Sequence, residues 1–193
     1  MTLLGVATPL AVLALIADAI VLAALLGLLL SRVSATARGW WDGLRDLVAP
    51  LALPGAFLVS LIAVSGSLYF QFGADLVPCQ LCWFQRICMY PMVVLLGVST
   101  VRRDLVSARL YALPLGIVGL GLSIYHYLLE RFPGQIHLNC GAGQPDCAVT
   151  PFNIFGFVSI PYLALAAFLL ILTLLLFARS DDQEGWEEAP AAS

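Results

Sequence analysis

Residues 79–101 read CQLCWFQRICMYPMVVLLGVSTV, two cysteines with two residues between them, followed by a long apolar run. The run at 83–101 carries a single charge, Arg86, and approaches the roughly 20 helical residues that cross the hydrocarbon core of a bilayer. A helix is expected there because it pairs all its backbone polar groups within the segment. The stretch therefore predicts a membrane-spanning helix that opens on a cysteine pair.

Four further apolar stretches have the length of membrane spans, and they run near 3–30, 51–70, 110–129 and 154–178. Of the 193 residues, 61% are hydrophobic and 11% are charged, against about 45–50% and about 25% in soluble proteins, and the mean hydropathy is +0.97. We predict an all-α integral membrane protein with five helices, which excludes a soluble domain. No nucleic-acid partner is expected, because no basic patch exists outside the short segments between spans.

The arginines predict the orientation. All nine positive charges are arginines, since the chain has no lysine. Seven of the nine lie in segments 31–50 and 102–109 or at Arg179, which a five-span arrangement places on one side of the membrane. The positive-inside rule then predicts an N-terminus outside, a C-terminus in the cytoplasm, and outward loops at 71–82 and 130–153.

The remaining segments complete this organisation. The first span, within 1–30, lacks a basic segment before its apolar run and is too long for a signal peptide, so we expect an uncleaved helix. Segment 31–50 is predicted to be a cytoplasmic linker, and the acidic segment 179–193 a disordered cytoplasmic tail. Asp18 is expected to be protonated or to face the bundle, because an acid at mid-bilayer costs about 2.5–3.5 kcal/mol.

Four of the five cysteines fall in the two outward loops. Cys79 and Cys82 lie at the mouth of the third span, Cys140 and Cys147 lie in the second loop, and only Cys88 lies inside a span. The outside is the oxidising compartment, in which disulfides form and persist. Two cysteine pairs on one membrane face indicate disulfide chemistry, while Cys88 is expected to be a packed, inert residue.

Three alternatives compete with a redox role for these pairs. Two static disulfides that hold the loops are the simplest. A structural zinc site is disfavoured, because six residues separate Cys140 from Cys147 and zinc-binding pairs have shorter spacing. A haem attachment site is excluded, because Trp83 stands where that motif has histidine.

Local chemistry favours the redox role for the first pair. A cysteine in the first turn of a helix lies at the positive end of the helix dipole, which favours the thiolate. Arg86 follows Cys82 by four residues, on the same helix face, and can stabilise both that thiolate and an electron-rich oxygen nearby. The alternative for Arg86 is an anchor at the membrane surface. An electron acceptor at this depth is expected to be a membrane quinone, since no nucleotide-binding motif is present.

The run from Cys79 to Pro91, CQLCWFQRICMYP, resembles the signature of the disulfide bond formation protein B (DsbB) family, and FGFVSIP within 153–168 resembles its last helix. The resemblance covers roughly residues 51–178. It implies a four-helix membrane bundle with two extracytoplasmic cysteine loops, to which span 1–30 is an addition. It also implies electron transfer from an extracytoplasmic thioredoxin-fold dithiol oxidase (DsbA- or BdbD-like) to a quinone, ubiquinone or menaquinone, without a metal, in the bacterial cytoplasmic (inner) membrane.

The resemblance also implies roles for single residues. The partner oxidase would attack the disulfide Cys140–Cys147 at Cys140, and Cys147 would then form a transient bond with Cys79. Cys82 would reduce the quinone. Arg86 and His126 are the candidate quinone-binding residues, although packing or a place in an interfacial aromatic belt is an alternative for His126.

Two other functions stay open from the sequence. An enzyme similar to vitamin K epoxide reductase would also join a Cys-x-x-Cys pair to a quinone, but its motifs have a different order. A non-catalytic membrane scaffold would keep the cysteines as structural disulfides or as metal ligands. Turnover with a reduced dithiol partner and quinone distinguishes an enzyme from a scaffold.

Overall fold

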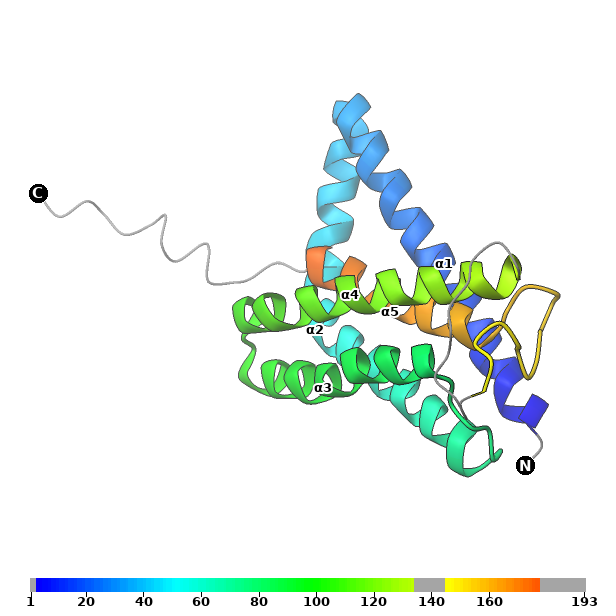
Figure 1. Cartoon of the computed structure of the whole chain (residues 1–193). Coiled ribbons are helices and arrows are strands. Elements are labelled where there is room, and N and C mark those ends of the chain that lie inside the picture. Colours follow the sequence, from blue (N-terminus) through cyan, green and yellow to red (C-terminus); the bar gives the residue numbers. More distant parts are fainter. Residues whose placement is uncertain (1–2, 134–144, 178–193) are drawn as a thin grey trace, which may run out of the picture.

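The computed structural model describes residues 3–133 and 145–177, and within them the chain forms five helices (Figure 1). They are α1 (Leu3–Val33), α2 (Ala35–Phe72), α3 (Gln80–Arg102), α4 (Leu105–Arg131) and α5 (Ile160–Phe177). All five are long and apolar enough to cross a membrane. The prediction of an all-α membrane protein with five helices is confirmed. Cys140 and the tail at 179–193 lie outside the described residues.

Helices α1 and α2 form a long hairpin whose apex points away from the other three helices in Figure 1. Only Ser34, in an extended conformation, separates them. The Arg38 Nε–H donates to the Ser31 carbonyl at 3.2 Å and closes the turn. A Cβ on Gly27 would lie 2.2 Å from the Trp41 ring, so glycine allows this ring to pack across the hairpin.

Segment 31–50, predicted to be a cytoplasmic linker, is helical apart from Ser34, and residues 35–50 continue into the span of α2 without a break. The apolar pattern marks only the part of a helix that lies in lipid. The 38 residues of α2 rise about 57 Å, well beyond a hydrocarbon core of about 30 Å, so one part of α2 extends past it. Trp41 and Arg45 in this part pack on the Phe177 ring at the end of α5, with centroid distances of 5.5 and 5.6 Å.

Polar caps start α3 and α4 earlier than their apolar runs predict, because a capping side chain can satisfy free backbone N–H groups of the first turn. Cys79 caps α3, and its sulfur accepts a hydrogen bond from the Cys82 N–H. Asp104 caps α4 by accepting from the Ser107 N–H at 2.9 Å. That hydrogen bond lowers the pKa of the Asp104 carboxyl.

Helix α5 begins later than predicted, at Ile160 rather than at 154. The preceding residues form a tight turn in which Ile154 and Val158 pair as an antiparallel bridge. Phe155 and Gly156 both have positive φ angles, 55° and 79°, which an α-helix does not admit. The apolar side chains of this turn made it indistinguishable from a span by hydropathy.

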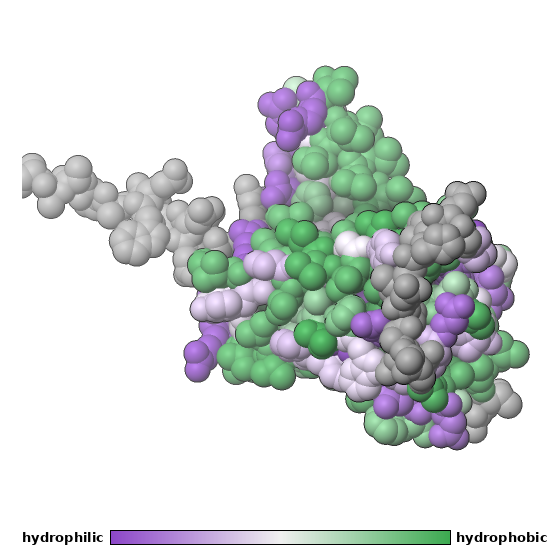
Figure 2. All heavy atoms as spheres, viewed as in Figure 1, coloured by the Kyte–Doolittle hydropathy of each residue, from purple (hydrophilic) through white to green (hydrophobic). Residues whose placement is uncertain are grey.

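The core lies among α2, α3, α4 and α5, and the outer surface is rich in exposed large apolar side chains, as expected for contact with lipid. Figure 2 shows hydrophobic residues along the α1–α2 hairpin and hydrophilic ones at its apex. Helices α4 and α5 approach closely where Gly116 and Gly119 face Leu172 and Phe168.

The close contact at Gly119 predicts a strong local effect of one added methyl group. A Cβ there would lie 2.3 Å from the ring of Phe168, which is fully buried. Gly119→Ala should therefore destabilise the bundle by about 1–3 kcal/mol, seen as a lower thermal midpoint in detergent. The matched control is Gly121→Ala on the same helix, because nothing lies within 4 Å of that position. Equal midpoints for the two variants would contradict this packing.

Candidate active site

The Cys79–Cys82 pair lies where the loop after α2 meets α3. The two sulfurs are 3.1 Å apart, and the Cys79 S–H donates to the Cys82 sulfur. The Cys82 N–H donates in turn to the Cys79 sulfur at 3.4 Å, which keeps both side chains on the first turn. Cys79 is buried and Cys82 is half-buried. Because Cys82 accepts the hydrogen bond between the two sulfurs, its sulfur is the one of the pair that can carry negative charge.

The same contact determines the protonation of Cys79. The hydrogen bond to Cys82, together with burial, raises the pKa of the Cys79 thiol to about 12. His126 opposes this rise only in part. At neutral pH the proton therefore stays on Cys79.

A pH titration of the reduced protein tests this assignment. Only a thiolate is alkylated, so iodoacetamide should label Cys79 slowly at pH 8, with a rate that rises toward a midpoint near pH 12. In Cys82→Ala the largest cause of the shift is gone, so the midpoint should fall toward the ordinary value of 9.0. Peptide mass spectrometry reads out the labelling of Cys79 alone. A midpoint below pH 9 in the parent protein would rule out the described hydrogen bond.

Arg86 is tied to α2. Its Nε–H donates to the Ser67 hydroxyl at 2.9 Å, one terminal N–H donates to the Ser67 carbonyl at 3.0 Å, and another donates to the Gln71 side chain. Its guanidinium also lies over the Trp83 ring, 5.3 Å from the centroid. A surface anchor would expose its charge, whereas Arg86 is only 9% exposed. Three of its five N–H groups are used in these bonds, which leaves two for a ligand.

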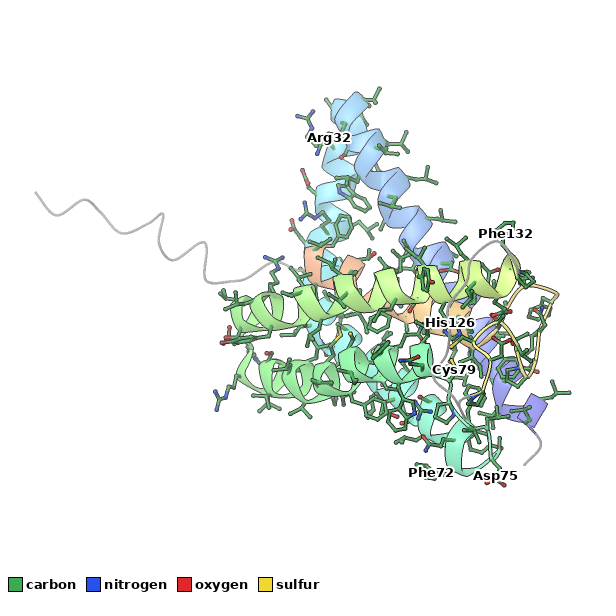
Figure 3. All side chains as sticks on the ribbon, in the orientation of Figure 1. Arg32, Phe72, Asp75, Cys79, His126 and Phe132 are labelled. Atoms are coloured by element: carbon green, nitrogen blue, oxygen red, sulfur yellow. The ribbon has the colours of Figure 1, made fainter. Side chains whose placement is uncertain are left out.

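His126 reaches the cysteine pair from α4, as Figure 3 shows for His126 and Cys79. Its Nε2 lies 3.7 Å from the Cys79 sulfur, and the side chain is 3% exposed. Its Nδ1 is buried and has no hydrogen-bond partner among the described residues. The ligand atoms of Cys79, Cys82 and His126 lie within 4.8 Å of one another. Sulfur and imidazole suit zinc, but a closed structural site needs a fourth ligand, and this group of described residues supplies three.

The other cysteines occupy distinct places. Cys147 is 2% exposed and belongs to the same buried cluster as Cys79, Leu81 and Leu129. Its predicted partner Cys140 is not among the described residues. Cys88 is buried in the main core, as expected for a packed residue.

One cavity of about 660 Å³ joins these groups. Its lining is mostly apolar and comes from all five helices and from the loops that precede α3 and α5. The polar and ionisable side chains that line it include Cys79, Cys82, Gln85, Arg86, His126, Glu130, Ser67, Asp146 and Cys147.

Sequence reasoning missed three features of this site. Gln85 donates to the Ser123 hydroxyl at 3.1 Å and joins α3 to α4 beneath the cysteines. Glu130 lines the cavity one turn after His126, and one of its carboxylate oxygens is buried without a partner among the described residues. The spacing of His126 and Glu130 was a signal for a shared helix face. Nothing in the sequence pointed to Ser67 as the partner of Arg86.

The comparison with protein families matches residues 50–178 to the model described as "Disulfide bond formation protein DsbB". This chain belongs to the DsbB family. The predicted family resemblance is thereby confirmed, and the protein is a multi-pass membrane oxidoreductase of disulfide bond formation.

Relatives of the DsbB family support this assignment. "Disulfide bond formation protein C" of Bacillus subtilis (strain 168) is 42% identical over 133 residues, which cover 68% of this chain and 95% of the relative. A "Probable disulfide formation protein" of Coxiella burnetii (strain CbuK_Q154) is 41% identical over 124 residues, 64% of this chain and 84% of the relative. No solved structure matches the chain. The DsbB match starts at residue 50, so α1 and the first part of α2 precede it.

Proposed function

We propose that this protein reoxidises an extracytoplasmic thioredoxin-fold dithiol oxidase and passes the electrons to a membrane quinone. The observation that carries the proposal is the Cys79–Cys82 pair, which lines an apolar cavity together with Arg86 and His126. Family membership supports disulfide generation in general. The mostly apolar cavity beside the cysteine pair supports a membrane quinone as the electron acceptor.

The residues present fit a quinone. The cavity volume of about 660 Å³ lies within the range of about 300–1,000 Å³ that holds small organic ligands. Two unused N–H groups of Arg86 and the unpartnered Nδ1 of His126 can bind the polar head group. The apolar remainder of the lining suits a hydrocarbon tail. A bound quinone would supply an acceptor for two electrons and two protons.

The protein's own groups have separate roles in this proposal. Cys82 is the donor sulfur, because Cys79 holds the proton that the two sulfurs share. Arg86 stabilises negative charge on Cys82 and on the acceptor, and Ser67 and Gln71 hold its guanidinium in place for that task. His126 binds the head group and can hold or release a proton at Nδ1.

The cysteines then work as a relay of thiol–disulfide exchange. A thiolate of the partner attacks Cys140 in the Cys140–Cys147 disulfide and releases Cys147. Cys147 attacks Cys79 in the Cys79–Cys82 disulfide and releases Cys82. The second partner thiol displaces Cys140, and Cys140 displaces Cys79 from Cys147. The partner is now oxidised, the loop disulfide is restored, and Cys79 and Cys82 hold the two electrons, with one proton on Cys79 and the second proton released. The burial of Cys147 beside Cys79 supports this order.

We place the protein in the bacterial cytoplasmic membrane, with both cysteine loops and the N-terminus outside and the C-terminus in the cytoplasm. The distribution of arginines supports this orientation. The start of α1 and the loop before α5 lie toward the same end of the molecule in Figure 1, as the orientation requires.

The proposal is tested by anaerobic quinone reduction with a reduced thioredoxin-fold dithiol as electron donor. Purified protein in detergent should show turnover that needs both donor and quinone, followed by quinone absorbance. In sealed right-side-out vesicles, an impermeant donor should sustain turnover only from outside, which tests the orientation separately. A static scaffold would show no quinone-dependent turnover in either preparation, and that result would refute the proposal.

A further inference from the structure

Helix α1, which precedes the family match, forms one wall of the cavity. Its contribution consists only of leucine, isoleucine and alanine side chains, namely Leu10, Leu13, Ala14, Ile16, Ala17 and Ile20. We propose that α1 is a binding wall for the hydrocarbon tail of the quinone, so that this protein encloses on one side a tail that would otherwise lie in lipid. This inference rests on the proposed function and adds to it a binding element specific to the N-terminal extension.

Small residues bring α1 close to the bundle. Ala7, Ala11, Ala14 and Ala17 recur at three- and four-residue intervals, and all are buried. Leu10 lies over Gly66 of α2, where a Cβ would come within 3.0 Å of the leucine side chain. In membranes, small residues allow such close packing between helices. Helix α1 therefore packs closely against the bundle.

A hydrogen bond sets the position of α1 along the bundle. The Tyr162 hydroxyl of α5 donates to the Asp18 carboxyl in the middle of α1. Burying an acidic side chain within a span costs free energy unless it has a hydrogen-bond partner. This bond therefore favours the observed position of α1 over positions shifted along the helix axis. Tyr162 is itself held between the rings of Tyr127 and Phe157, each 5.6 Å from it. Asp18, expected to be protonated or to face the bundle, contacts α5 of the bundle through this bond.

The lining of the cavity combines polar and apolar side chains from different helices. The groups that can bind a polar head, Cys82, Arg86 and His126, come from α3 and α4. The lining residues of α2 and α5 are mostly apolar, among them Val59, Ile62, Ala63, Leu163, Ala164 and Leu170. A single cavity that combines hydrogen-bond donors from α3 and α4 with mostly apolar side chains from α1, α2 and α5 matches a polar ring that carries a hydrocarbon tail. A lipid acyl chain would use the aliphatic part alone and would leave the donors without a ligand.

The first test measures how the apparent KM depends on the tail. Ala14→Leu places a larger side chain in the α1 wall, so the ratio of the KM for a ten-carbon-tailed ubiquinone to that for its tail-less analogue should rise about fivefold or more. The matched control is Ala19→Leu, the same change on the exposed side of α1 and away from the cavity, and its ratio should stay within about twofold of the parent.

A second variant and a binding measurement cover the case in which Ala14→Leu fails to fold. Leu13 and Ile16 line the cavity but are about half exposed, so Leu13→Ala with Ile16→Ala removes tail contacts with little effect on the fold. The ratio of the KM for the ten-carbon-tailed ubiquinone to that for the tail-less analogue should rise in this variant also. Independently, a ubiquinone analogue with a photoreactive group near the start of its tail should label peptides from residues 10–20, and excess plain quinone should prevent the labelling.

The possible outcomes separate this inference from the proposed function. Unchanged ratios in the folded variants, or labelling confined to α2 and α5, would overturn the role of α1 while quinone turnover persists. Labelling of residues 10–20 that plain quinone does not prevent would assign the space to lipid and would also overturn it. Absence of quinone turnover in the parent protein would refute the proposed function itself.

Discussion

Cys82→Ala is expected to abolish quinone reduction, with a loss greater than about a thousandfold, because it removes the sulfur that donates to the acceptor. The loss should be confined to this step. Cys79 then lacks its neighbour on α3 but still lies in the buried cluster with Cys147, so oxidation should trap a Cys79–Cys147 disulfide. Anaerobic quinone absorbance measures the first effect, and mass spectrometry of the disulfide-linked peptides measures the second.

The matched control for this variant is Cys88→Ala on the same helix. Cys88 lies in the apolar core away from the cavity lining, so its removal should keep turnover within about twofold of the parent. Substantial quinone reduction by folded Cys82→Ala would contradict its role as the donor sulfur. Equal losses in the two variants would indicate that damage to α3 packing, rather than chemistry, causes the effect.

Arg86→Met is expected to lower quinone reduction about a hundredfold, because the loss of one preorganised charged donor costs roughly 3 kcal/mol in the transition state. Methionine keeps much of the apolar stem, so α3 should still insert. Thiol–disulfide exchange with the partner should persist, since it takes place in the loops. Arg86→Lys should recover only part of the activity, because a point charge does not replace the planar fork that binds Ser67 and Gln71. Turnover across a range of quinone concentrations measures the effect.

Arg86 also joins α3 to α2 through hydrogen bonds. The control variant must therefore remove a comparable interhelical hydrogen bond away from the cavity. Arg109 provides one, since its Nε–H donates to the Leu175 carbonyl at 2.8 Å and joins α4 to α5 outside the cavity lining. Arg109→Met should lower the thermal midpoint in detergent while quinone turnover of the folded protein stays near that of the parent. If Arg86→Met stays within about twofold of the parent, Arg86 only holds α3 against α2.

Local features of the sequence predict the membrane class, the number of helices and the place of the cysteine pair at the start of α3. These features depend on local composition and on spacing along one helix, which hydropathy and motif spacing report directly. The same locality explains the errors. Residues 35–50 are helical but not apolar, whereas 154–159 are apolar but contain two positive φ angles, so hydropathy misplaced both helix starts.

Which distant residues meet at the cavity depends on how the helices pack against one another. Residue spacing along the chain does not relate His126 to Cys79, Ser67 to Arg86, or Asp18 to Tyr162, since each pair joins two helices across a helix–helix interface. Their rotation and depth follow from side-chain packing, such as Gly119 against Phe168 and Leu10 over Gly66. For the same reason, the sequence predicted an additional N-terminal helix but not that α1 lines the cavity. That depends on which face of α1 docks, which the buried alanines and the Asp18 contact determine together.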